Sequence, residues 1–143
     1  MNERLKLENQ LCFPLYVCAK EVVRSYTPLL EPLGLTYTQY IAMMALWEHK
    51  SLTVKEMGRL LMLDSGTLTP MLKKMEKAGW LKRERSRKDE RKVIITITDE
   101  GELLQEKAAE VPVRMAQCIT LGNEEAIQLY TLLKRLMKTF NNQ

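Results

Sequence analysis

Residue types and motifs on which enzymes commonly depend are scarce in this sequence of 143 residues. It has one histidine, His49, and three widely spaced cysteines. A single histidine excludes metal sites that need several histidines and most histidine acid–base relays. Glycine-rich phosphate loops, a Cys-x-x-Cys pair and a Gly-x-Ser-x-Gly motif are all missing. The sequence therefore predicts a protein that is not an enzyme and that uses no metal or other cofactor.

Long apolar runs are also missing. No segment approaches the roughly 20 apolar residues that a membrane-spanning helix needs, and no basic-then-apolar signal peptide opens the chain. An odd number of cysteines at wide spacing does not make the disulfide framework of a secreted protein. We therefore expect a cytoplasmic protein whose cysteines begin as thiols. The length and the 45% hydrophobic content predict one globular domain, residues 1–143.

The positive charge of the chain is concentrated in one short segment. Lysine and arginine number 22 against 18 aspartate and glutamate, a net charge of +4. Residues 82–92 alone hold seven basic and three acidic residues, an excess of four, so the rest of the chain balances to zero. A local excess of this kind indicates a polyanionic partner, most directly duplex DNA.

The apolar periodicity and the capping residues predict six helices and one β-hairpin. We expect helices over about residues 7–30, 38–49, 54–62, 65–78, 100–117 and 123–140, and strands at 80–85 and 92–98. Pro14 indicates that the regular part of the first helix begins near that residue or bends there. Thr38 is the expected N-cap of the second helix, and Thr98 or Asp99 that of the fifth.

A helix-turn-helix pattern lies in the middle of the chain. Thr53 and Glu56 have the spacing of a capping box, and Asp64 or Ser65 can cap the helix that follows. The apolar side chains expected to be buried in the two helices are Val54, Met57, Leu60 and Leu61, then Leu68, Leu72 and Met75. Together with the hairpin that follows, this order predicts a winged helix-turn-helix flanked by terminal helices.

The second helix of this pattern has the side chains that a helix in the major groove needs. Short hydroxyls at its N-terminal end can approach base edges, and lysines further along can meet phosphates. The candidate DNA-binding residues of this helix are Ser65, Thr67, Thr69, Pro70, Lys73, Lys74 and Lys77. The alternative is a merely solvated face, which a lysine-rich helix without a basic hairpin beside it would favour.

The tip of the hairpin is the second candidate for contact with DNA. Arg91 on a thin loop can enter the narrow minor groove, where the negative potential is strongest. Asp89 can hold the turn or orient the guanidinium of Arg91. The remaining candidates of the hairpin are Arg85, Arg87 and Lys88. The alternative for Asp89 and Arg91 is a surface ion pair that contributes less than ~1 kcal/mol.

Three segments together carry a family resemblance: Asp64-Ser-Gly-Thr-Leu-Thr-Pro-Met-Leu-Lys-Lys-Met-Glu, Asp89-Glu-Arg91 and Ile97-Thr-Asp-Glu-Gly101. They resemble the multiple-antibiotic-resistance regulator (MarR) family over nearly the whole chain. The resemblance implies a mainly α fold with a small β wing, with a winged lobe at about residues 36–98 and helical dimerisation regions at about 1–35 and 100–143. It also implies a homodimeric repressor that binds pseudo-palindromic operator DNA.

The segment Lys6-Leu-Glu-Asn-Gln-Leu-Cys12-Phe-Pro-Leu-Tyr16 resembles the branch of that family that senses organic hydroperoxides (OhrR-like). The resemblance makes Cys12 the reactive thiol, makes Tyr26 and Tyr37 the tyrosines that reach it across the dimer, and makes Cys118 a resolving cysteine as in two-cysteine members. Tyr16 is a local candidate to support the thiol or a packing residue. Pro14 is a departure beside Cys12.

The chemistry of Cys12 can be argued from the residues alone. A thiol reacts with a peroxide as its thiolate, which a helix N-terminus or hydrogen-bond donors favour. Tyr26 lies fourteen residues further on, roughly 21 Å along a helix axis, and cannot reach the Cys12 of its own chain. An antiparallel partner chain could deliver it. Peroxide would give a sulfenic acid, which ends as such, as a mixed disulfide with a small thiol or, as the resemblance implies, as a Cys12–Cys118 disulfide.

Other interpretations of the same residues stay open. All three cysteines, and Cys18 in particular, can be small core residues. A phenolic ligand that binds between the dimer helices and the lobes could replace thiol oxidation as the signal. A thiol peroxidase that uses Cys12 is the third alternative, and no thioredoxin-like βαβ pattern supports it.

Overall fold

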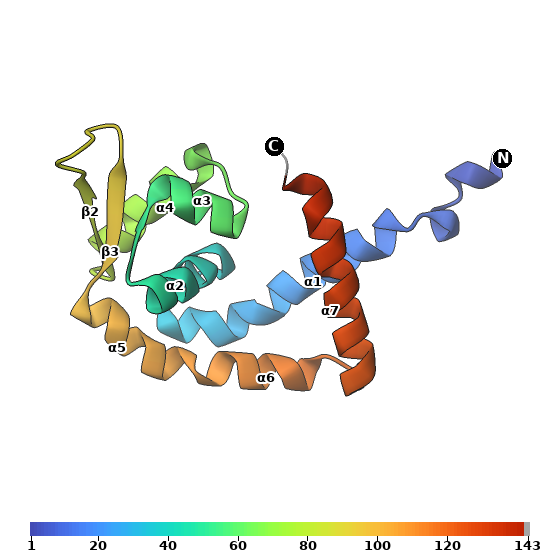
Figure 1. The fold of residues 1–143 in the computed structure, drawn as a ribbon. Coiled ribbons are helices and arrows are strands. Elements are labelled where there is room, and N and C mark those ends of the chain that lie inside the picture. Colours follow the sequence, from blue (N-terminus) through green and yellow to red (C-terminus); the bar gives the residue numbers. More distant parts are fainter. Residues whose placement is uncertain (142–143) are drawn as a thin grey trace.

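In the computed structural model, which describes residues 1–141, a winged lobe stands at one end of a frame of long helices (Figure 1). The order along the chain is α1 (Cys12–Leu30), α2 (Tyr37–His49), β1 (Ser51–Thr53), α3 (Val54–Leu61), α4 (Ser65–Lys77), β2 (Leu81–Arg85), β3 (Val93–Ile97), α5 (Asp99–Ala108), α6 (Glu110–Cys118) and α7 (Asn123–Met137). Short 3-10 turns lie at Glu3–Leu5, Leu7–Asn9, Glu31–Leu33 and Lys138–Phe140. The predicted fold class is confirmed.

The first long helix begins later than its apolar pattern suggests. It starts at Cys12, and Pro14 falls in its first turn, where the missing N–H of proline removes no hydrogen bond of the helix. Residues 3–9 form two 3-10 turns instead. The amides of Asn9 and Gln10 hold this arm together by donating to the carbonyl oxygens of Glu3 and Arg4, both at 2.7 Å.

The N-cap of α2 is Thr36, and the expectation of Thr38 is wrong. The Thr36 hydroxyl accepts a hydrogen bond from the Gln39 N–H at 3.2 Å, and the Gln39 side chain accepts one from the Thr36 N–H at 3.0 Å. This reciprocal pair is a capping box, which satisfies two backbone donors at once. Thr38 has no glutamate or glutamine three residues on and cannot form one.

The core of the lobe is formed by α2, the helix-turn-helix and the sheet. Its fully buried large side chains include Met43, Leu46, Met57, Leu68, Leu72, Met75, Leu81 and Ile95. Full burial of a leucine or methionine contributes about 1.5–3 kcal/mol, so these residues dominate the stability of the lobe. The predicted burial of Met57, Leu68, Leu72 and Met75 is confirmed. Leu60 is 51% exposed and does not belong to this core.

The wing is a three-stranded antiparallel sheet in the order β1-β3-β2. The hairpin of β2 and β3 was predicted, and its register pairs Leu81 with Ile97 and Arg85 with Val93. The third strand, β1, was not predicted. It has only three residues and pairs Leu52 with Ile95, which places two buried side chains together. So short a strand has no alternation of its own that a sequence pattern could reveal.

The predicted helix over residues 100–117 is two helices. Helices α5 and α6 are separated at Ala109. Pro112 explains the break, because it has no N–H to donate to the Ala108 carbonyl and its ring crowds that same carbonyl. Within α6, Pro112 lies in the first turn, where proline is tolerated. Val111 and Met115 are the residues of α6 that are buried, and α6 packs against α1.

The start of α5 is attached firmly to the lobe. The Trp47 indole donates a hydrogen bond to the Gly101 carbonyl at 2.8 Å, and the Lys50 ammonium pairs with Glu102 at 2.6 Å. Gly101 lies so close to the Trp80 carbonyl and the Ile97 side chain that a Cβ atom would collide with both. These contacts fix the start of α5 against the lobe.

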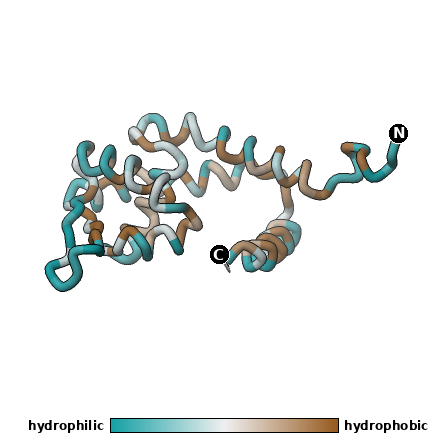
Figure 2. Tube along the Cα trace, turned by 90° about the horizontal axis from the view of Figure 1, so that it is seen from above, coloured by the Kyte–Doolittle hydropathy of each residue, from teal (hydrophilic) through white to brown (hydrophobic). Residues whose placement is uncertain are grey.

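Helix α7 makes few contacts within the protomer. None of its residues is buried, although Ile127, Tyr130, Leu132 and Leu136 are apolar or aromatic. Figure 2 shows hydrophobic and hydrophilic residues alternating along α7, in contrast to the uniformly hydrophilic tip of the wing. A helix with exposed apolar side chains of this kind needs a partner surface. In the described part of the chain, no helix is long and apolar enough to cross a membrane.

Candidate DNA-binding surface and thiol site

Helix α4 presents most of its predicted DNA-binding residues to solvent. Asp64 caps the helix by accepting a hydrogen bond from the Thr67 N–H at 2.7 Å, and bonds from Thr67 hold the pKa of Asp64 below its ordinary value. The buried face turns Leu68, Leu72 and Met75 to the core. The side chains left exposed are Ser65, Thr67, Pro70, Lys73, Lys74 and Lys77, whereas Thr69 is half-buried. This arrangement leaves hydroxyls at the N-terminal end and lysines further along.

The tip of the wing is an ordered turn that projects one arginine. Asp89 Oδ1 accepts a hydrogen bond from the Arg91 N–H at 3.1 Å and lies 3.5 Å from the Arg91 Nε. The Arg91 side chain is nevertheless 94% exposed. Asp89 thus holds the turn through the Arg91 N–H, and its carboxylate forms a surface ion pair with the Arg91 side chain. An exposed pair of this kind adds little to stability, so Arg91 is available for a ligand.

Arg85 stabilises the wing, although its side chain is exposed. Its guanidinium donates a hydrogen bond to the Glu90 carbonyl at 3.0 Å, which ties the end of β2 to the tip. Arg87 and Lys88 are exposed on the loop, and the Ser86 hydroxyl accepts from the Lys88 N–H at 3.2 Å. The hairpin therefore keeps several cations on a loop of fixed shape.

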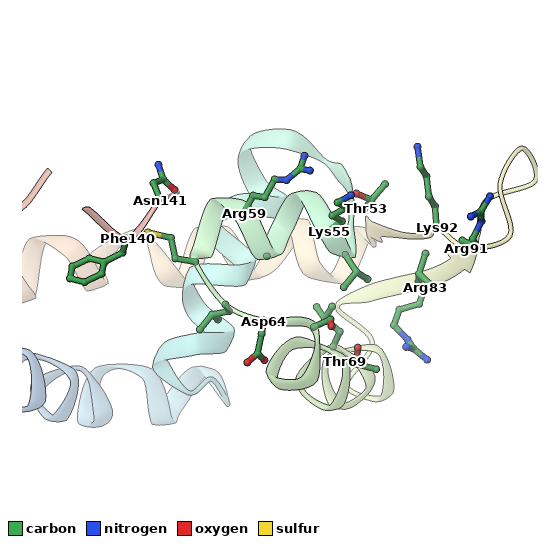
Figure 3. Close-up of a pocket in the computed structure, with 17 residues that line it drawn as sticks. Thr53, Lys55, Arg59, Asp64, Thr69, Arg83, Arg91, Lys92, Phe140 and Asn141 are labelled. Atoms are coloured by element: carbon green, nitrogen blue, oxygen red, sulfur yellow. The ribbon is translucent and has the colours of Figure 1, made fainter. Parts of the chain in front are cut away.

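An open groove lies between α3, the start of α4 and the base of the wing (Figure 3). Its cationic lining residues are Lys55, Arg59, Arg83, Arg91 and Lys92, and its acidic one is Asp64. At its far end lie Phe140 and Asn141, near the end of the chain. Four of these cations were not among the predicted site residues, because they lie outside the recognition helix and the hairpin tip: Lys55 and Arg59 of α3, Arg83 of β2, and Lys92 just before β3.

All three cysteines are free and exposed in the protomer. The interpretation of Cys18 and the others as small core residues is therefore wrong for the single chain. Cys12 is the first residue of α1, and Cys118 is the last residue of α6. These two helix ends lie on the side of the molecule away from the wing (Figure 1). The Cys118 thiol donates a weak bond to the Arg114 carbonyl at 3.5 Å.

Tyr26 and Tyr37 lie together at the opposite end of α1 from Cys12. Their ring centroids are 4.8 Å apart, and Tyr40 packs against both at 5.7 and 6.4 Å. Burial, and after it the neighbouring Tyr37, raises the pKa of Tyr26 above its ordinary value. Burial likewise raises the pKa of Tyr40. The raised pKa keeps the phenols of Tyr26 and Tyr40 protonated at neutral pH, so both remain hydrogen-bond donors.

Two aromatic residues of this cluster were missed by the sequence analysis. Tyr40 is buried, and its ring lies 6.5 Å from Trp47, the residue that holds the start of α5. Only the tyrosines that carry the family resemblance were selected, although Tyr40 falls one helical turn after Tyr37 and could have been placed on the same face. Tyr16 does not join the cluster: it is exposed on α1, with the Lys20 ammonium 5.4 Å from its ring centroid.

Metal chemistry finds no support in the described residues. Within residues 1–141, no group of three or more histidine, cysteine, aspartate or glutamate side chains could hold a metal ion. The site consists of two separate parts, a cationic surface on the lobe and exposed thiols at the ends of the frame helices.

Comparison with known proteins gives matches over the full length of the chain. The model of the transcriptional regulator SarA/Rot family matches residues 24–108. The organic hydroperoxide resistance transcriptional regulator of Bacillus subtilis (strain 168) is 48% identical over 141 residues, which cover 99% of this chain and 96% of that protein.

Two solved structures of AbfR, a protein of Staphylococcus epidermidis, are also similar. The structure of overoxidised AbfR bound to DNA matches this chain with a TM-score of 0.80 and 38% sequence identity. The match covers 96% of this chain and 97% of the AbfR chain. The structure of disulfide-formed AbfR matches with a TM-score of 0.68 and 40% sequence identity, over 94% of this chain and 95% of the AbfR chain. The chain thus superposes better on this DNA-bound form than on the disulfide form.

Proposed function

The chain belongs to the MarR/SarA family of winged-helix transcriptional regulators, and we propose that it is a homodimeric repressor that releases its operator when an organic hydroperoxide oxidises Cys12. The observation that carries this proposal is the exposed Cys12 at the start of α1, in a chain that resembles an organic hydroperoxide resistance regulator along its full length. We place its action in the cytoplasm, where the DNA lies.

The lobe supplies the DNA-binding half of the proposal. Helix α4 would enter the major groove with its hydroxyls toward base edges, and Lys73, Lys74 and Lys77 would contact phosphates. Arg91 would enter the adjacent minor groove. Accordingly, Arg91→Ala should weaken binding with an A·T-sensitive component, whereas Lys74→Ala should weaken it nearly equally on all sequences. Equal affinities of both variants and the wild type at moderate salt would contradict these roles.

The dimer follows from surfaces that the protomer leaves uncovered. Helix α7 has no buried residue, and Leu11, just before α1, and Phe13 and Leu15 in its first half are exposed. Burial of such faces between two copies is the arrangement that the hydrophobic effect favours. Cys12 and the Tyr26–Tyr37 pair lie at opposite ends of α1, so only an antiparallel partner chain would bring these donors to the thiol.

The chemistry of the proposed switch is a two-electron oxidation of sulfur. The Cys12 thiolate attacks the terminal oxygen of the hydroperoxide, the O–O bond breaks, and the alkoxide takes up a proton and leaves as an alcohol. Cys12 is then a sulfenic acid. The Cys118 thiol of the partner subunit attacks that sulfur, an S–S bond forms, and the oxygen leaves as water. A disulfide requires sulfurs about 2 Å apart, which would draw the helix ends together and move the lobes.

The disulfide, rather than oxidation of Cys12 alone, is the step to which we assign release of DNA. Overoxidised AbfR was captured on DNA, and AbfR also has a disulfide form. By analogy, Cys118→Ser in this chain should react with peroxide at Cys12 and yet stay on the DNA. The sulfenic acid and a mixed disulfide with a small thiol are the other fates of Cys12, and mass spectrometry of the treated protein distinguishes all three.

The test uses a labelled duplex that the reduced wild type selects from a random-sequence pool, with cumene hydroperoxide as the oxidant. Wild type and Cys18→Ser should release the duplex, whereas Cys12→Ser should stay bound. Retention of the duplex by oxidised wild type would refute the proposal. Release from Cys12→Ser by a phenolic compound such as salicylate, without any oxidant, would select the alternative in which a bound ligand is the signal.

A further inference from the structure

The charges that line the groove of Figure 3 do not balance within the protomer. Two of its five cations are paired: Arg83 with Glu76, whose carboxylate accepts from the Arg83 N–H at 2.7 Å and from its Nε at 3.4 Å, and Arg91 with Asp89. The three others are Lys55, Arg59 and Lys92. They are exposed, and none forms an ion pair within residues 1–141.

The fold brings these three cations together, although repulsion between their like charges lowers its stability slightly. Lys55 and Arg59 are four residues apart on α3, so their like charges face each other on one side of the helix and destabilise it slightly. Pairing of β1 with β3 joins Thr53 to Ile94 and so places the start of β3 beside the start of α3. In Figure 3 the side chains of Arg59 and Lys92 point to the same side of the groove, and Lys55 is drawn between them. Such a cluster is favourable only against an anion.

The position of the groove identifies the anion. On one side it is lined by Ser65 and Thr69 of α4, and on the other by Arg91 and Lys92 of the wing. In duplex DNA one sugar–phosphate strand always separates the major groove from the adjacent minor groove. With α4 in the first and Arg91 in the second, as the proposed function has them, that strand must cross between α4 and the wing, where the groove lies.

We infer that Lys55, Arg59 and Lys92 form a phosphate-binding strip for the DNA strand that crosses between α4 and the wing. The inference rests on the proposed DNA-binding function and adds α3 to the interface. A small anionic ligand fits the groove less well, because none of the described polar or charged side chains is buried to anchor it. A strand supplies one phosphate per nucleotide, and therefore several for several cations. Such contacts position the protein and raise affinity without selecting a sequence.

The experiment measures how affinity depends on salt. The logarithm of the binding constant falls linearly with that of the salt concentration, with a slope of about −0.9 for each phosphate contact. Each of Lys55→Ala, Arg59→Ala and Lys92→Ala should therefore make the slope shallower by about 0.9, or about 1.8 for a repressor that binds with two lobes. The probes are the selected duplex and a scrambled duplex of the same composition, and the ratio of their affinities should not change.

Two control variants make the test specific. Lys107→Ala removes the same charge from the exposed face of α5, outside the groove, and should keep the wild-type slope. Arg59→Lys keeps the positive charge and should therefore also keep the wild-type salt dependence. If wild type binds the selected duplex and the three groove variants retain its slope, or lose the preference for that duplex instead, the inference is wrong while the proposed function stands. If wild type selects no duplex, the proposed function itself fails.

Discussion

The winged lobe and the terminal helices of this chain differ in how they bury apolar surface. Within residues 1–141, every large side chain that is fully buried lies between Leu30 and Ile95, in the lobe and where α1 meets it. By contrast, α7 has no buried residue, and α1 buries only Leu30. One region completes its own core, and the other presents apolar faces that only another surface can cover. The lobe thus has a complete apolar core within one chain, whereas α7 and most of α1 do not take part in one.

The largest loss of stability is expected from a substitution in the core of the lobe. Leu72→Ala removes a fully buried side chain at the centre of α4, and we expect it to lower the free energy of unfolding by about 2–5 kcal/mol. The measurement is urea unfolding followed by circular dichroism. Because the lobe is packed within one chain, the loss should be the same at low and high protein concentration. A loss that disappears at high concentration would contradict a self-sufficient lobe.

The attachment of α5 to the lobe should be the next most sensitive point. Gly101→Ala places a Cβ atom against the Trp80 carbonyl, so the backbone must shift, at a cost of about 1–3 kcal/mol. Gly66→Ala is the matched control, because its Cβ atom would lie an ordinary 3.5 Å from the Asp64 carboxylate. If the two variants unfold at the same temperature, α5 is not held as tightly as we describe.

Helix α7 should respond in a way that depends on concentration. Leu132→Ala changes a residue that is 58% exposed in the protomer, so the substitution should hardly change the free energy of unfolding of a single chain. In a dimer that buries this face we expect a loss of roughly 1–2 kcal/mol. It would appear as a midpoint of thermal unfolding that recovers with increasing protein concentration, and as a higher dissociation constant in sedimentation. An unchanged dissociation constant would exclude Leu132 from the dimer interface.

The smallest effect concerns the cap of α4 and its pH dependence. The pKa of Asp64 is held low by bonds from Thr67, so the cap stabilises the fold above the ordinary carboxyl range and is lost as pH falls through the lowered value. Asp64→Asn retains a capping side chain that does not titrate. The wild type should therefore unfold at a higher temperature than the variant near neutral pH, and this difference should disappear below about pH 4. A difference in unfolding temperature that is constant from pH 7 to pH 3 would contradict this role.

The sequence predicted the lobe well because its signals are local. Hydrophobic spacing, Asp64 as the cap and the basic hairpin each act within a few residues of the structure that they specify. The errors near the lobe had signals that were overlooked: Gln39 three residues after Thr36 marks the capping box of α2, and Pro112 marks the break after Ala108. Strand β1 had none, because three residues are too few to show alternation.

The thiol site was less predictable for a different physical reason. Cys18 was interpreted as a core residue, yet it is exposed in the protomer, as are the apolar side chains of Leu15 and Val22 on α1. Periodicity indicates that a face is apolar and does not indicate whether it packs within the chain or against a second copy. The same limit applies to Tyr26 and Tyr37. Their proximity is visible in one chain, whereas their proposed approach to Cys12 needs two.

The most direct test of a thiol switch that two chains complete is a mixed dimer. In a Cys18→Ser background, one protomer carries Cys12→Ser and the other Cys118→Ser, and the two are mixed, exchanged and treated with cumene hydroperoxide. Neither variant alone can form a Cys12–Cys118 disulfide. We predict that the mixture gives a crosslinked dimer on a non-reducing gel and that its duplex is released. Absence of the crosslink from the mixture, with an intrachain Cys12–Cys118 disulfide in the wild type, would contradict the account.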